Sequence, residues 1–219
     1  MGVTRVTLNE AASIMDKKNF HGPTVVRKRL GINLRHRSFN TVPFGADVLQ
    51  AVAYSHVLVA VPSVSIMDLH AKRSELFLTR HGLQRLAFGS NRDPWYGEPL
   101  QRIAFSEAKT EPGWYLLRKD HAWGSVSRDF PGQCVLVRPP DFVPEANLVV
   151  YAWILHYLAT GERMFSRYWV RTHSQTAEND RHVRLRGDKG GLIISRWRDD
   201  AAGFGAPQSV GIASARKPS

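Results

Sequence analysis

The chain has 219 residues, of which 43% are hydrophobic, and its formal net charge is +11 at pH 7. This length and apolar content predict a globular protein with a sizeable core, and the single cysteine excludes an internal disulfide and a cysteine-based zinc site. Because the sequence has neither a run of about 18 apolar residues nor a secretory signal, we expect a cytoplasmic protein with no membrane span.

The positive charge is concentrated toward the two ends. Residues 1–40 hold eight basic and two acidic residues, residues 181–219 hold eight and three, and the 140 residues between them are neutral overall. Such a balance indicates an acidic partner, which could be nucleic acid, an anionic surface or an acidic protein.

Two short helices are predicted near the N-terminus. Apolar residues at helical spacing predict the first over residues 8–16, with Thr7 or Asn9 as its cap. Pro23 in a first turn and Gly31 at the stop predict the second. Six residues separate these helices, more than the three or four of a helix-turn-helix motif, so we favour a packed helical appendage over a DNA-binding unit.

The middle of the chain alternates between short elements. Helices are predicted over residues 44–54 and 63–78, loop over 82–111, and strands over 56–61, 113–118 and 134–137.

The clearest element is a helix over residues 144–158. Pro144 suits its start, Gly161 its stop, and apolar residues almost all round predict that it is buried. Four strand-like segments follow it, at residues 167–171, 182–186, 192–197 and 210–214.

The chain carries no recognised catalytic motif. HExxH, GxSxG and GxxxxGK[ST] are all missing, so we expect neither a metal site nor a cofactor. Arg186-Gly187-Asp188 spells a cell-adhesion tripeptide, but a turn at a strand end explains Gly-Asp as well. Arg196-Trp197-Arg198 has the composition of a binding hot spot. The same residues also suit the end of a strand whose tryptophan lies in the core, and their chemistry does not decide between the two interpretations.

Several stretches together resemble the variable proteins of diversity-generating retroelements. They are VYAWILHYLATGERMFSRYWVRTHS, GGLIISRW and VGIASARK, with weaker likenesses in KNFHGP, SHVLVAVPSVSIMDL and GWYLLRK. The resemblance implies a C-type lectin fold of the branch shared with formylglycine-generating enzymes. This is an α+β domain with a long buried helix and short twisted antiparallel strands, preceded here by a small helical N-terminal part.

In that family a reverse transcriptase copies a template repeat with errors at adenines, and the changed codons encode exposed ligand-contacting residues. Carried over by position, the resemblance implies variable, ligand-binding residues at Arg184, Arg186, Asp188, Ser195, Arg196, Arg198, Asp199, Asp200, Phe204 and Gln208. It implies a fixed scaffold at Gly191, Leu192, Trp197, Gly211, Ser214, Ala215 and Arg216.

The resemblance also excludes two activities found on related folds. The calcium-and-sugar signatures of true C-type lectins are missing, and the enzyme relatives use a pair of cysteines, which Cys134 alone does not supply. We therefore expect a non-catalytic protein that binds a protein target, with an appendage at 1–43, a lectin-like domain at 44–219 and a variable region at about 182–212. The alternative is a basic nucleic-acid-binding protein that uses its N-terminal helices and C-terminal basic face.

Overall fold

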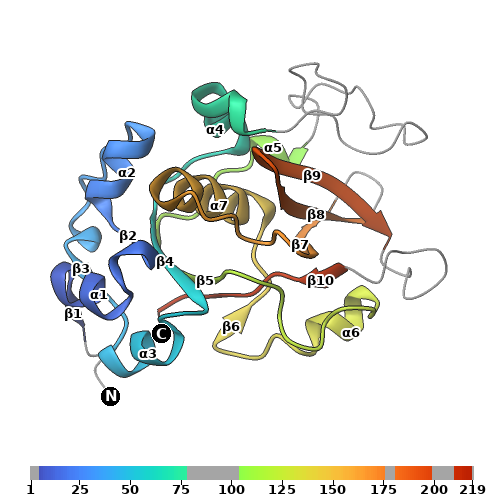
Figure 1. The fold of residues 1–219 in the computed structure, drawn as a ribbon, viewed down its shortest axis with the longest axis horizontal. Coiled ribbons are helices and arrows are strands. Elements are labelled where there is room, and N and C mark those ends of the chain that lie inside the picture. The colour runs from blue at the N-terminus through green and yellow to red at the C-terminus, as the bar shows by residue number, and fades with distance from the viewer. Residues whose placement is uncertain (1–4, 78–103, 176–180, 199–209, 219) are drawn as a thin grey trace.

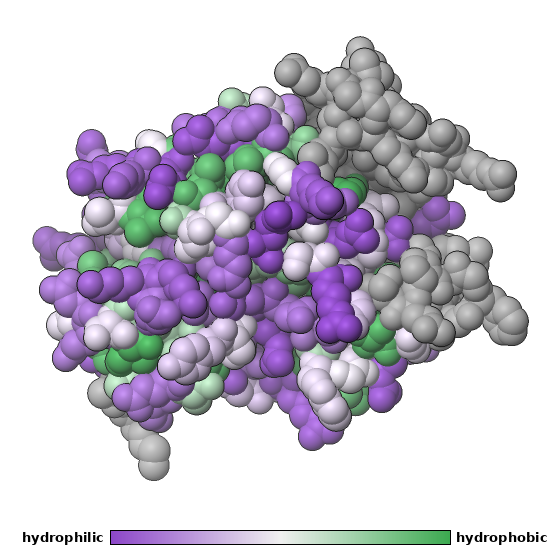
Figure 2. Space-filling view, viewed as in Figure 1, coloured by the Kyte–Doolittle hydropathy of each residue, from purple (hydrophilic) through white to green (hydrophobic). Residues whose placement is uncertain are grey.

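The computed structural model describes residues 5–77, 104–175, 181–198 and 210–218 (Figure 1). Within these segments the chain is an α+β protein with mixed sheets, which confirms the predicted class. Hydrophilic residues cover most of the face shown in Figure 2, with smaller apolar areas between them. None of the helices in the described segments is both long enough and apolar enough to cross a membrane.

The larger sheet has five strands in the order β2-β4-β5-β11-β6. Their bounds are β2 (Phe20–His21), β4 (His56–Val61), β5 (Gly113–Arg118), β11 (Ala215–Arg216) and β6 (Asp141–Phe142). Every residue of β4 is buried, as its nearly all-apolar sequence predicts. The C-terminal strand β11 lies between β5 and β6, so the end of the chain is built into this sheet.

The second sheet has four strands in the order β10-β7-β8-β9, and a two-stranded ribbon pairs β1 with β3. The bounds are β7 (Trp169–Gln175), β8 (Arg181–Asp188), β9 (Gly191–Arg198), β10 (Val210–Ile212), β1 (Val6–Thr7) and β3 (Thr41–Val42). The sequence predicts antiparallel strands, but β10 runs parallel to β7 and β2 runs parallel to β4. Since β8 and β9 intervene between β7 and β10, no hairpin forces those two strands to be antiparallel.

Helix α7 (Ala146–Thr160) lies at the centre of the molecule and packs against both larger sheets (Figure 1). Its residues 146–156 are all buried, and Gly161 ends it in the left-handed conformation at φ 76°, as predicted. The Tyr151 hydroxyl donates to the Ala60 carbonyl of β4 at 2.7 Å, and the Trp153 indole donates to the Met164 carbonyl at 2.9 Å. The helix thus joins the two halves of the core.

The other helices surround this core. Their bounds are α1 (Leu8–Ile14), α2 (Pro23–Leu30), α3 (Ala46–Val52), α4 (Ile66–Arg73), α5 (Ala104–Glu107) and α6 (Phe130–Cys134), with 3-10 turns η1 (Lys17–Asn19), η2 (Arg37–Phe39) and η3 (Ser74–Leu76). Thr7 and Glu10 form a reciprocal capping box at α1, and Gly31 ends α2 at φ 67°, so both predicted N-terminal helices are confirmed. The two helices are separated by η1 and β2, and β2 pairs with β4 of the larger sheet. The domain boundary predicted at residue 43 stays a prediction.

Two further sequence interpretations are wrong. No strand forms over 134–137: Cys134 is the last residue of helix α6, and residues 135–137 form a turn in which the Val137 amide donates to the Cys134 carbonyl at 3.0 Å. The helix begins where the Asp129 carboxylate accepts the Gly132 amide at 2.9 Å, with Pro131 in the first turn. Gly187 does not form a turn: it lies inside β8, and the turn comes later, at Gly190 with φ 86°.

Candidate ligand-binding face

The second sheet has one apolar face and one polar face, because successive side chains along a strand point to opposite sides of the sheet. Val170, Val183 and Leu185 are fully buried in the core that includes α7. On the opposite side, Trp169, Arg184 and Arg186 are only partly buried. The strand register aligns them, because Val170 pairs with Leu185 and the following positions alternate across β7 and β8.

Trp169 is the centre of a cation–π cluster on this polar face. The guanidinium of Arg184 lies 4.3 Å from the Trp169 ring centroid, and that of Arg186 lies 5.2 Å from it. Arg186 also donates to the Asp188 carboxylate at 3.1 Å. We call these four residues, Trp169, Arg184, Arg186 and Asp188, the arginine–tryptophan face. It offers an aromatic surface, two cations and one anion to a partner.

Burial and neighbouring cations act against the positive charge of Arg184. Burial, followed by the charges of Arg171 and Arg186, lowers the pKa of Arg184 to about 9. Arg171 is fully buried beside it and donates to the Gln133 side chain at 3.1 Å. A site built this way favours carboxylates and other anions, because an added negative charge relieves the repulsion among the arginines.

Helix α6 closes one end of the polar face. Gln133 donates from its amide to the Ser125 and Val210 carbonyls at 2.8 and 2.9 Å, which fixes α6 against β10. The Phe130 ring stacks on His182 of β8, with the ring centroids 3.5 Å apart. Helix α6 therefore covers the end of the sheet next to the arginine–tryptophan face.

The structure places the predicted variable residues unevenly. Arg184, Arg186 and Asp188 lie together on the polar face, whereas Ser195 is only 8% exposed and pairs with Arg184 in the sheet register. Arg196 and Arg198 belong to β9, where they pair with Val183 and Arg181. Four more predicted positions lie outside the described residues: Asp199, Asp200, Phe204 and Gln208.

The predicted scaffold residues lie inside the fold. Gly191, Leu192, Ser214 and Ala215 are buried, and Arg216 donates to the Asp141 carboxylate at 2.6 Å. A Cβ at Gly211 would lie 2.5 Å from His121 Cβ and 2.8 Å from Ser125 Oγ, so only glycine fits there. Trp197 belongs to β9 and pairs with His182.

Trp169 is the residue of this face that sequence analysis missed. It lies within a predicted strand, but its role comes from two arginines on the neighbouring strand β8. Only the pairing of β7 with β8 would have revealed it, and that register is not readable from either strand alone.

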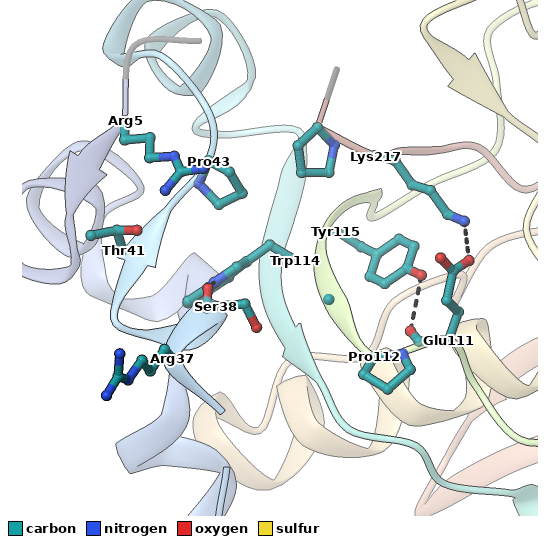
Figure 3. A pocket seen from close by; sticks show the side chains of 12 residues that line it. Arg5, Arg37, Ser38, Thr41, Pro43, Glu111, Pro112, Trp114, Tyr115 and Lys217 are labelled. Atoms are coloured by element: carbon teal, nitrogen blue, oxygen red, sulfur yellow. Dashed lines mark hydrogen bonds and ion pairs between the residues drawn. The ribbon is translucent and has the colours of Figure 1, made fainter. Parts of the chain in front are cut away.

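A separate pocket of about 520 Å³ lies where the N-terminal part meets β5 and the C-terminal tail (Figure 3). Trp114 and Tyr115 of β5 line it, and both have their polar atoms satisfied, by the Ser38 and Glu111 carbonyls. Lys217 forms an ion pair with the Glu111 carboxylate across one side. The pocket therefore lies at a junction between chain segments, and the polar atoms of its two aromatic side chains already have partners within the protein.

Comparisons of the chain with protein-family models, curated proteins and solved structures find no match.

Proposed function

We propose that the protein is a non-catalytic display protein of the diversity-generating retroelement type, with a C-type lectin-like scaffold, which binds a protein target through the arginine–tryptophan face and the adjoining C-terminal residues. The observation that carries the proposal is the alternation along β8. Arg184, Arg186 and Asp188 lie on the polar side of this strand, while Val183, Leu185 and Gly187 are fully or almost fully buried against the core.

This alternation suits a protein whose binding residues change while its fold does not. Arg186 and Asp188 keep 34% and 39% of their side-chain surface exposed, so they can be replaced without opening a cavity in the core. Tryptophan and arginine are the residues enriched at protein-binding hot spots. With the net charge of +11, they favour an acidic target and faster association at low salt.

The first test is the DNA around the gene. We expect a second, near-identical copy of the segment that encodes about residues 182–212, lying beside a reverse-transcriptase gene. The two copies should differ almost only at template adenines, and the differences should include the codons for Arg184, Arg186 and Asp188. The codons for Val183 and Leu185 provide the internal control and should match. The absence of such a copy, or differences that concentrate in the buried codons, would contradict the proposal.

The second candidate function is nucleic-acid binding, which the exposed Arg27 and Lys28 of α2 favour. The two functions differ in their response to salt. Affinity for nucleic acid falls by roughly one log unit per log unit of salt for each phosphate neutralised, whereas a tryptophan-centred protein interface weakens only modestly. Titration of a short DNA duplex at several salt concentrations, with the variants Arg27→Gln and Lys28→Gln, separates them.

A further inference from the structure

The pocket of Figure 3, which we call the junction pocket, carries positive charge that no other described residue balances. Its volume of about 520 Å³ lies within the range of small-molecule sites. Its basic side chains are Arg5, Arg37 and Lys217, and Glu111 is the only acid among the described residues that line it. Glu111 forms an ion pair with Lys217, which leaves the two arginines without a carboxylate partner in the described part of the chain.

The β1–β3 ribbon positions Arg5 at the pocket. Its antiparallel register pairs Val6 with Val42, so the residue before β1 lies beside the residue after β3. Figure 3 shows the Arg5 guanidinium next to the ring of Pro43, as this register requires. The Arg5 side chain is exposed, so its charge is accessible to a ligand in the pocket.

The 3-10 turn η2 positions Arg37, its first residue, and this turn is fixed on β5. The Trp114 indole donates to the Ser38 carbonyl at 3.2 Å, and the Phe39 ring lies 6.2 Å from the Trp114 ring, measured between centroids. The Arg37 side chain is exposed and forms no hydrogen bond with another described residue. Both arginines are therefore carried by paired or packed backbone while their side chains stay accessible.

The rest of the pocket wall is largely apolar. Pro43, Pro112 and Pro218 line it, together with the small exposed parts of the Trp114 and Tyr115 rings. An apolar surface beside unpaired cations favours a ligand that has both an apolar body and a negative charge.

Gly113 leaves space open at the start of β5, inside the junction pocket. Apart from its chain neighbours, a Cβ at this position would meet only Tyr115 Cε2 within 4 Å, at an ordinary 3.6 Å. A longer side chain at residue 113 would therefore extend into free volume rather than into the core.

We propose that the junction pocket binds a small organic carboxylate with an apolar body, whose charge is neutralised by Arg5 and Arg37 and whose body lies against the proline and aromatic wall. The planar guanidinium group matches the geometry of a carboxylate and donates to both of its oxygens. A bare anion would leave the apolar wall uncovered, and a neutral analogue would leave the arginines unpaired. Binding that requires both parts of the ligand is thus the signature of the site, and it does not depend on the function proposed for the arginine–tryptophan face.

The test compares three probes: phenylacetate, its neutral amide phenylacetamide, and acetate, which lacks the ring. The full chain is titrated with each at neutral pH and equal ionic strength, and the backbone NMR signals of Thr41 and Gly113 report on the pocket. We expect these signals to shift and saturate with phenylacetate. The dissociation constants of the other two should be at least about tenfold larger, because each lacks either the charge-assisted hydrogen bonds or the buried ring. An equal affinity for the amide or for acetate, or no saturable shift at these residues, would overturn the proposal without any variant.

A matched pair of double variants tests the two arginines. Arg5→Gln with Arg37→Gln should weaken phenylacetate about tenfold and leave phenylacetamide unchanged. Arg27→Gln with Arg138→Gln removes the same charge from exposed positions outside the pocket and should leave both affinities within about twofold. Equal weakening of phenylacetate by the two double variants would refute the role of the pocket in favour of a general charge effect.

A matched pair of substitutions at Gly113 tests the pocket volume without changing any charge. Gly113→Leu should occupy the space beside Tyr115 and weaken phenylacetate at least about tenfold, whereas Gly113→Ala should stay within about threefold of the unmodified chain. The NMR spectrum of each variant shows whether the native fold is kept. A Gly113→Leu chain that keeps the native fold and binds phenylacetate as tightly as the unmodified chain would exclude the junction pocket as the binding site.

Discussion

Gly187 lies where β8 packs against Trp153 of α7, and its replacement by alanine tests how the ligand-binding face is supported. A Cβ at this position would lie 2.7 Å from Trp153 Nε1 and closer still to the Met164 carbonyl oxygen. Those two groups are hydrogen-bonded to each other at 2.9 Å, and the carbonyl belongs to the backbone, which cannot swing away like a flexible side chain. The methyl group must therefore displace β8 or break this hydrogen bond.

The expected loss can be worked out from these two effects. Overpacking a core costs about 1–3 kcal/mol and a buried hydrogen bond contributes about 1 kcal/mol, so Gly187→Ala should lower the free energy of unfolding by about 2–4 kcal/mol. For a chain of this length the melting temperature should fall by roughly 5–15 °C.

A matched glycine provides the control for this measurement. Gly113 also lies in a strand, and a Cβ there would meet only Tyr115 Cε2, at an ordinary 3.6 Å. Gly113→Ala should therefore melt within a few degrees of the unmodified chain. If thermal unfolding gives the two variants the same melting temperature, then Gly187 does not fix β8 on α7 and our account of the scaffold is wrong.

Two further predictions concern buried polar groups. Burial lowers the pKa of His21 to about 3 and those of His56 and His156 to about 4, so the folded chain keeps them neutral while the unfolded chain takes up protons below about pH 6.5. The free energy of unfolding should be greatest above that pH and should fall by about 2 kcal/mol per histidine by pH 5. The measurement is urea denaturation at pH 8 and at pH 5, and equal free energies of unfolding would contradict the prediction. Tyr151→Phe removes a buried hydrogen bond to β4 and should cost about 1 kcal/mol in the same assay, whereas Tyr54→Phe, at a residue 81% exposed, should cost nothing measurable.

The sequence predicts the elements well where the signal is local. Thr7 and Glu10 are three residues apart, and the capping box they form starts α1 where the apolar spacing indicates. Pro23 and Gly31 bound α2 in the same way. The prediction of a strand over 134–137 fails because the Asp129 carboxylate caps a helix that runs to Cys134, and the three apolar residues after it form the turn that leaves this helix.

Neither the arginine–tryptophan face nor the buried contact of His21 Nε2 with His156 Nδ1 could be assembled from the sequence alone. His21 and His156 are 135 residues apart, and no spacing rule connects them. The cluster around Trp169 depends on the register between β7 and β8, where a shift of one residue would move Arg184 and Arg186 to the core side. Local chemistry can suggest which residues bind, but only the pairing of distant segments shows which of them meet.

Helix α7 explains how one chain can hold a changeable face on a constant core. Trp153 fixes the inner side of β8 through Gly187, and His156 fixes β2 through His21. Substitutions at Arg186 or Asp188 touch neither contact, because they lie on the outer side of β8. We therefore expect a variant with Arg186→Ala and Asp188→Ala to lose target binding while its melting temperature stays within a few degrees of that of the unmodified chain. If the melting temperature fell as far as we expect for Gly187→Ala, these side chains would support the fold, and the scaffold would not be independent of its binding face as we propose.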